Sequence, residues 1–191
     1  MKRIIVLASG SGSNAENIIS FFKKTDSIKV CAVLTNKKTA AVLERCERLE
    51  TPAFYFNKTA FSGSDAVIRL LKALNPDLIV LAGFLWKIPA SLIKVFPNNI
   101  INIHPALLPK YGGKGMYGGK VHQAVKDNSE SETGITIHYV NENYDEGAII
   151  FQAKTTVTPS DDANSIAKKV HQLEYEHFPK VIEKLLLKDG Q

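Results

Sequence analysis

The chain has 191 residues, 45% of them hydrophobic, and carries a formal net charge of +5. This length and composition fit one globular domain with an ordinary core, so we expect residues 1–191 to form a single domain. The lysines are scattered and no apolar run reaches the length of a membrane span, which argues against nucleic-acid and membrane partners.

The sequence also carries signals about the compartment. The apolar run that follows Met1, Lys2 and Arg3 is too short for a signal peptide. Cys31 and Cys46 are predicted to be reduced packing residues, because two thiols do not make a disulfide framework. We therefore expect a cytoplasmic protein.

The first half of the chain alternates short apolar runs with helical patterns. The predicted strands are 3–8, 28–34, 53–56, 78–81 and 100–104, and the predicted helices between them are 14–24, 40–49, 65–74 and 90–95. Because these strands are apolar on nearly every residue, the pattern predicts a parallel sheet that is covered on both faces.

The order changes after residue 118. A short helix at 120–126 precedes two predicted strands, 134–140 and 148–157, which can pair as a hairpin that extends the sheet. A final helix follows the start signals at 158–162, and Pro179 is predicted to kink or restart it. The fold class is therefore α/β: a Rossmann-like, doubly wound, mostly parallel sheet of about seven strands with a C-terminal antiparallel hairpin extension.

A glycine-rich turn, Ser9 to Asn14 (SGSGSN), connects the first strand to the first helix. Glycines let the backbone approach a ligand there, and the amides at the start of a helix favour an anion such as phosphate. The turn is not a P-loop, and it fits the dinucleotide fingerprint only loosely. The alternative interpretation is a tight strand-to-helix turn that needs glycine for its backbone alone.

Polar residues end the strand 100–104. Asn102 and His104 share one face of this strand while Ile101 and Ile103 share the other, and Pro105 ends the strand. The carboxyl ends of parallel strands form the ligand crevice of such sheets. The glycine-rich segment 105–119 follows, and a loop of this length is typical of a functional segment. The alternative is a capped strand whose side chains only satisfy loop backbone.

The acidic turn 141–147 can supply a carboxylate if the hairpin lies beside this strand. A carboxylate near the histidine should raise its pKa, and a cationic histidine with a neutral amide would stabilise an oxyanion. No serine or cysteine stands in a nucleophile motif, so the attacking group is expected to be a substrate amine. Spacing alone does not choose among Glu142, Asp145 and Glu146.

The sequence resembles the phosphoribosylglycinamide formyltransferases, the folate-dependent enzymes of purine synthesis, along essentially its whole length. Four segments carry the resemblance: SGSGSN at 9–14, LAGF at 81–84, NIHPALLPKY at 102–111 and YDEG at 144–147. It implies formyl transfer from 10-formyltetrahydrofolate, as a co-substrate, to glycinamide ribonucleotide without a metal. These two small molecules are the expected partners, with the chain a monomer or weak homodimer.

The resemblance also implies residue roles. It assigns catalysis to Asn102, His104 and Asp145. For the ribonucleotide it implies Gly12, Ser13 and Asn14 at the phosphate, Glu174 at the ribose, and Pro109. For the folate it implies Leu85, Trp86, Lys87, Ile88, His138 and Val140, together with Asn102.

Some positions depart from the pattern of the family. Leu85 and Trp86 stand where members often carry Met-Arg, and Ser64 stands near an arginine that can meet the glutamate tail of the folate. Recognition of the tail is therefore expected to be weak unless a lysine such as Lys87 compensates. Trp86 is equally consistent with an ordinary core aromatic, and the glycine content of 111–119 suits a mobile lid.

Two related enzymes and one different class of protein are the alternatives. Methionyl-tRNA formyltransferase carries an R-G-x-A-P run after Leu-Leu-Pro and a tRNA-binding domain, and this chain has neither. Formyltetrahydrofolate deformylase adds an N-terminal regulatory domain, for which we expect no room before Ile4. A phosphate-binding module without catalysis would leave the asparagine, the histidine and the acid unexplained.

Overall fold

A seven-stranded sheet forms the centre of the molecule, with the order β3-β2-β1-β4-β5-β6-β7. The structure is a computed structural model and describes residues 1–188. Five parallel strands are followed by two antiparallel ones: β1 (Lys2–Leu7), β2 (Ile28–Thr35), β3 (Ala53–Tyr55), β4 (Leu78–Leu81), β5 (Ile100–His104), β6 (Glu132–Tyr139) and β7 (Ile149–Thr156). The predicted fold class, including the hairpin extension, is confirmed.

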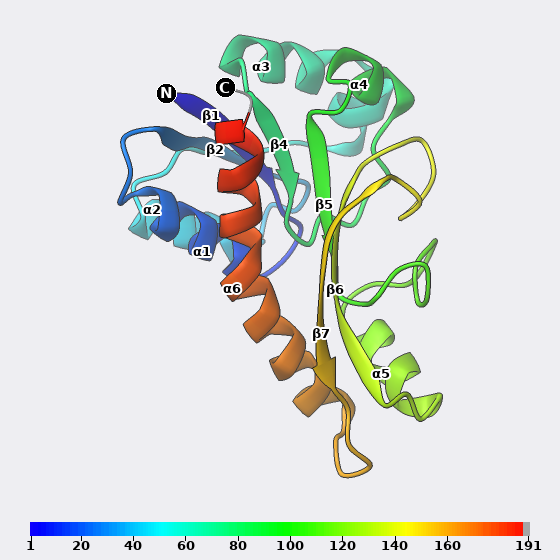
Figure 1. Cartoon of the computed structure of the whole chain (residues 1–191). Helices are drawn as coiled ribbons and strands as arrows, with labels where there is room; N and C mark the ends of the chain where they lie inside the picture. Colours follow the sequence, from blue (N-terminus) through cyan, green and yellow to red (C-terminus); the bar gives the residue numbers. More distant parts are fainter. Residues whose placement is uncertain (189–191) are drawn as a thin grey trace.

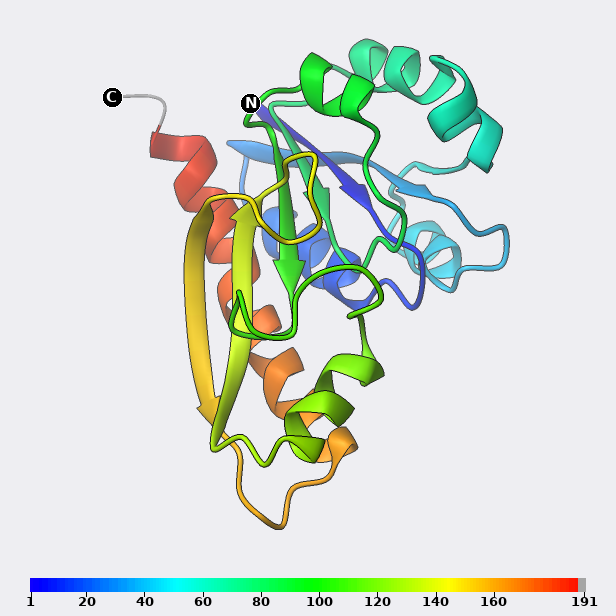
Figure 2. The ribbon, with the colours of Figure 1, turned by 90° about the vertical axis from the view of Figure 1, so that its right-hand side faces the viewer.

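Helices cover both faces of the sheet (Figures 1 and 2). One face packs against α1 (Ser13–Phe22), α2 (Val42–Arg48), α5 (Gly119–Asp127) and α6 (Ala163–Lys188). The other packs against η1 (Thr59–Gly63), α3 (Ala66–Leu74) and α4 (Ala90–Val95). The sequence pattern did not predict η1, a single turn of π-helix. Each face has its own buried cluster, because neighbouring side chains of a strand point to opposite sides.

This alternation decides which way the polar end of β5 faces. Ile101 and Ile103 belong to the core under α1 and α6, whereas Ile100 belongs to the opposite core. Asn102 and His104 therefore share the face of Ile100, as predicted. β6 lies antiparallel beside β5 and pairs Asn102 with His138, so the hairpin does flank this strand.

The last helix, α6, is continuous from Ala163 to Lys188 and runs past Pro179. Of the two predicted effects of Pro179, a kink or a restart, the restart is wrong. Proline has no N–H to donate to the carbonyl four residues earlier, which here is that of Tyr175. The side-chain amide of Asn17 in α1 donates to this carbonyl at 3.0 Å, so a neighbouring helix satisfies the group that proline leaves free.

No helix within residues 1–188 has the length and apolar content to cross a membrane.

A double-mutant cycle tests this contact. Asn17→Ala should lower the free energy of unfolding by about 1 kcal/mol, the usual value of one such hydrogen bond. In a Pro179→Ala background the restored backbone N–H supplies its own bond to Tyr175, so the same change should cost less than half as much. Urea unfolding of the four proteins measures the coupling, and an equal cost in both backgrounds would contradict the contact.

Candidate active site

A cavity of about 610 Å³ opens at the carboxyl ends of β1, β4 and β5. This is the place where open parallel sheets bind ligands, and the volume suits a small molecule. Its walls come from the glycine-rich turn, the loops after β4 and β5, the acidic turn, α5 and α6. The lining includes Gly12, Ser13, Asn14, Leu85, Asn102, His104, Asp145 and Glu174.

The glycine-rich turn needs its glycine for a structural reason. Gly12 has φ +74°, and a Cβ there would lie 2.3 Å from the Val42 side chain and 2.9 Å from its Cα. Glycine is thus required at position 12 whether or not a ligand binds. Its presence therefore does not decide between a phosphate-binding turn and a tight turn that binds nothing. The turn also joins the cavity walls, because the Ser9 hydroxyl accepts a hydrogen bond from the Leu85 N–H at 2.9 Å.

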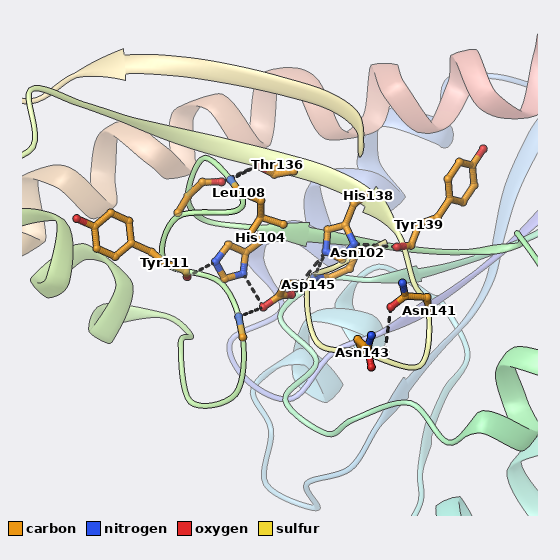
Figure 3. Close-up of polar contacts among 12 residues, drawn as sticks. Asn102, His104, Leu108, Tyr111, Thr136, His138, Tyr139, Asn141, Asn143 and Asp145 are labelled. Carbon is orange, nitrogen blue, oxygen red and sulfur yellow. Dashed lines mark hydrogen bonds and ion pairs between the residues drawn. The ribbon is translucent and has the colours of Figure 1, made fainter. Parts of the chain in front are cut away.

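Three polar side chains converge on the carboxylate of Asp145 (Figure 3). His104 Nδ1 and His138 Nε2 each lie 3.6 Å from one of its oxygens, and Asn102 Nδ2 lies 3.5 Å away. The backbone N–H of Gly113 donates to it at 2.9 Å. Among the three acids that spacing left open, Asp145 is thus the one in this cluster, and the longer distances leave room for an incoming group.

Backbone carbonyls fix the proton positions of both imidazoles. His104 Nε2 lies 2.7 Å from the Tyr111 carbonyl, so it must donate, and Nδ1 of the neutral ring is left bare toward Asp145. His138 Nδ1 donates to the Tyr139 carbonyl at 2.8 Å. Its Nε2 then accepts from the Asn102 amide at 3.1 Å. Both Asn102 N–H groups therefore point at protein partners here.

Burial, not the neighbouring carboxylate, dominates the charge state of His104. Its side chain is almost fully buried, and the loss of hydration lowers its pKa below the usual value. Asp145 and the Tyr111 carbonyl oppose this shift without reversing it, and His138 adds to it. The expectation that the carboxylate raises the histidine pKa is therefore wrong in its net direction.

Asp145 shows the opposite balance. Burial alone would raise its pKa. The contacts with His138 and His104 and the hydrogen bond from the Gly113 N–H outweigh that effect and lower the pKa below its usual value. The carboxyl group is therefore ionised at neutral pH and, beside the bare nitrogen of His104, forms a pair of proton acceptors.

Both backbone segments that hold His104 are strained. Tyr111 and Asp145 have φ values of 57° and 56°, in the left-handed region that costs a residue with a side chain about 1 kcal/mol or more. The acidic turn also packs tightly on β6, because a Cβ on Gly147 would lie 1.7 Å from the Tyr139 carbonyl oxygen. The turn can reach His104 only with glycine at that position.

The loop that carries Tyr111 is pinned to β6. The Thr136 hydroxyl donates to the Ala106 carbonyl at 2.7 Å and accepts from the Leu108 N–H at 3.0 Å. Gln152 in β7 donates both to this hydroxyl and to the Leu108 carbonyl. The hairpin thereby fixes both the acid and the carbonyl that face His104.

The residues expected at the ribonucleotide are brought together only in part. Asn14 in α1 donates to the Glu174 carboxyl in α6 at 2.9 Å, and both line the cavity with Gly12 and Ser13. Burial raises the pKa of Glu174, against the effects of Asn14 and His171. Pro109 instead lines a separate hollow beside Gln152 and Lys154.

The residues expected at the folate lie mainly beside the cavity rather than in its wall. Leu85 lines it and Ile88 is buried. Trp86 packs 5.7 to 6.4 Å from the rings of Phe56, Phe61 and Phe84, as a core aromatic does. Lys87 lies over the ring of Tyr144, whereas Val140 bonds through its backbone N–H to the Ile100 carbonyl.

Sequence reasoning missed two histidines of the cavity wall, His122 in α5 and His171 in α6. Their rings are 6.4 Å apart and nearly perpendicular. His122 lies one residue after the buried Val121 and one turn before the buried Val125. The sequence could thus have indicated His122 as a histidine on the apolar face of a helix. The same pattern also occurs for structural histidines whose hydrogen bonds are made within the core. Within residues 1–188 no group of three or more His, Cys, Asp or Glu side chains is arranged so that it could hold a metal ion.

Comparison with known proteins identifies similar chains. Residues 2–182 match the family model described as formyl transferase. The chain is 37% identical to phosphoribosylglycinamide formyltransferase of Haemophilus influenzae, over 100% of this chain and 92% of that protein. It is also 37% identical to the chloroplastic enzyme of Arabidopsis thaliana, over 95% of this chain but only 64% of that longer protein. The crystal structure of phosphoribosylglycinamide formyltransferase from Bacillus halodurans superposes with a TM-score of 0.88 and 32% identity, covering 99% and 97% of the two chains.

The charge state of His122 predicts acid sensitivity. Burial, His171 and His104 lower its pKa to about 4, whereas the unfolded chain protonates it near 6.5. Unfolding therefore takes up a proton as the pH falls from about 6.5 to 4, and stability contributed by the neutral ring is lost over that window. We expect His122→Gln to remove about 2 kcal/mol of the pH dependence between pH 7 and 4.

Urea unfolding at pH 7, 5.5 and 4 measures this effect, with His177→Gln as a control that removes a histidine outside the cavity lining. An identical loss of stability in the wild type and in His122→Gln would contradict it.

Proposed function

The chain belongs to the formyl transferase family, and on that premise we propose that it transfers the formyl group of 10-formyltetrahydrofolate to the amine of glycinamide ribonucleotide. The products are formylglycinamide ribonucleotide and tetrahydrofolate, in purine synthesis. The observation that carries the proposal is the meeting of Asn102, His104 and Asp145 in one cavity with the glycine-rich turn and Glu174.

The acceptor lies along the cavity with its phosphate at the N-terminal amides of α1. Ser13 and Asn14 are the first residues of this helix and line the cavity, and a helix N-terminus favours an anion. Glu174 lies beside Asn14 and is the acceptor for a ribose hydroxyl. This orientation directs the amine toward β5, where Asn102 and His104 end the strand.

Asp145 and His104 provide the proton acceptor. The amine nitrogen attacks the formyl carbon and a new C–N bond forms, so the nitrogen must lose a proton. Bare His104 Nδ1 and the ionised Asp145 lie 3.6 Å apart and both lack that proton. A proton that enters between them, directly or through a water, relieves their repulsion and makes His104 a cation.

The same step stabilises the oxygen. Negative charge develops on the formyl oxygen as the tetrahedral intermediate forms, and the newly cationic His104 lies next to it. Asn102 supplies a second donor by turning one N–H from the long 3.5 Å contact with Asp145 to this oxygen. Collapse of the intermediate breaks the bond from the formyl carbon to N10 of the folate, and the proton passes to that nitrogen.

One assay tests the proposal directly. The purified chain is incubated with 10-formyltetrahydrofolate and either glycinamide ribonucleotide or methionyl-tRNA, and formylated product is measured. Formylglycinamide ribonucleotide should form, with no formylation of the tRNA. Transfer to the tRNA instead would select the rival formyltransferase, and release of formate alone would select a deformylase.

Removing the acid tests the proton acceptor. Asp145→Asn should lower kcat by at least about a hundredfold, the low end for a positioned acid–base group. It should also move the His104 titration to lower pH, because the carboxylate is the main group that opposes the effect of burial. NMR titration of His104 beside kcat measures both, and near-normal turnover or an unshifted pKa would show that Asp145 is not its partner.

Removing the amide tests the oxyanion role. Asn102→Ala should lower kcat about a hundred- to a thousandfold with a small change in the KM values, because the donor acts mainly in the transition state. A change confined to KM would assign Asn102 to binding alone.

The structure adds a second lysine to the question of the glutamate tail. Lys87 lies 5.6 Å from the ring of Tyr144, which lines the cavity, and Lys58 lies 4.6 Å from the ring of Trp86, one of the residues expected at the folate. We expect a polyglutamate tail to gain only a few-fold in affinity from these exposed charges, with strong salt dependence.

Comparing the KM of mono- and triglutamylated folate in Lys58→Ala, Lys87→Ala and the remote control Lys24→Ala measures this contribution. A gain that survives both alanine variants would show that other groups hold the tail.

A further inference from the structure

His122 occupies a middle position in the cavity wall. The ring comes from α5 and lies 6.4 Å from the ring of His171 in α6, one helical turn before Glu174, which lines the same cavity. The ring is also close enough to His104 for that residue to lower the pKa of His122. His122 is only 2% exposed, yet it lines the cavity, so the ring is held by the fold and presents little more than an edge to a ligand.

The ring is neutral at physiological pH and has one defined proton position. Burial and the two neighbouring histidines lower its pKa to about 4. Nδ1 is buried without a hydrogen-bond partner, and a proton there would bury an unpaired donor, which proteins avoid more strictly than an unpaired acceptor. The proton therefore sits on Nε2, the nitrogen through which the ring can meet a ligand.

Its neighbours restrict the ligand chemistry. Glu174 is 6% exposed, and one of its oxygens accepts from Asn14. A neutral N–H donor and a carboxyl acceptor in the wall of one cavity suit a hydroxyl group, which accepts from one and donates to the other. A phosphate would meet the buried carboxyl there, and an ammonium group would face the N–H of the imidazole. Neither charged group fits this pair.

We propose that His122 Nε2–H donates a hydrogen bond to a ribose hydroxyl of the acceptor substrate, which makes His122 a specificity-determining residue; this rests on the proposed function. The order of groups along the cavity agrees with it. Asn14, at the end of the turn that takes the phosphate, donates to Glu174, and His104 at the amine is near enough to His122 to lower its pKa. The sugar lies between the phosphate and the amine in the substrate itself.

Two substitutions separate hydrogen bonding from packing. His122→Phe keeps a planar ring without a donor, whereas His122→Gln keeps a side-chain N–H. We expect His122→Phe to raise the KM for glycinamide ribonucleotide about five- to thirtyfold, the effect of losing one such bond. The KM for the folate and the thermal midpoint should change little, and His122→Gln should recover most of the loss.

Deoxy analogues of the substrate provide the matched readout. The 2′- or the 3′-deoxyribonucleotide should bind more weakly than the parent to the wild type, and this penalty should be smaller in His122→Phe, where only the contact with Glu174 is left to lose. The ratio of the KM of His122→Phe to that of the wild type should also stay constant from pH 6 to 8.5, because His122 is neutral throughout this range. The other charged groups of the cavity are present in both proteins, so their effects on KM cancel in the ratio.

The outcomes are distinguishable. An inactive wild type would overturn the proposed function and this inference with it. An active wild type whose KM for the ribonucleotide is unchanged by His122→Phe would overturn the inference alone, as would equal losses for both substrates. Equal penalties for the deoxy analogues in both proteins would also overturn it. A KM ratio that falls as pH rises through 6.5 would replace it with a cationic contact to phosphate.

Discussion

The position of one carboxylate, that of Asp145, is the constraint on which the site depends. Its turn folds back over β6 closely enough that only glycine fits at position 147, and its own backbone adopts a left-handed conformation. The Gly113 N–H and the imidazoles of His104 and His138 then surround the carboxylate. The cluster around Asp145 therefore forms only when three elements are all correctly placed: the β6–β7 hairpin, the glycine-rich loop and the end of β5.

Desolvation sets how this cluster is charged. The carboxylate stays ionised because the Gly113 N–H and the contacts with His138 and His104 outweigh its burial, whereas His104 has a lowered pKa because burial outweighs the nearby carboxylate. A neutral imidazole next to a carboxylate is ready to receive a proton, and it becomes the cation that an oxyanion needs only after the amine has attacked. The order of these events removes the need for a buried cation in the resting enzyme.

The sequence predicted the fold and the strand end well, because these follow from local patterns. Apolar runs without alternation indicated the covered parallel sheet, and the period of two along β5 correctly placed Asn102 and His104 on one face. Spacing could not choose Asp145 over Glu142 and Glu146, since that choice depends on the path of a turn. Sequence reasoning also missed His122, because its place in the cavity wall depends on packing against α6, about fifty residues further along the chain.

The net pKa shift of His104 was also beyond sequence reasoning. A carboxylate nearby is visible as a possibility in the chain, but the burial that outweighs it is a property of the packed cavity. The same holds for Pro179, where Asn17 of another helix satisfies the carbonyl that proline leaves free. In both cases a long-range contact determines the outcome of a local signal.

The proton position on His104 is the quantity that tests this mechanism most directly. The ¹⁵N shifts of a histidine-labelled sample at pH 7.5, without ligands, report which ring nitrogen is protonated. We predict a neutral ring protonated on Nε2 alone, because Nε2–H donates a hydrogen bond to the Tyr111 carbonyl and Asp145 faces bare Nδ1. A proton on Nδ1, in the neutral ring or in a cation, would contradict it.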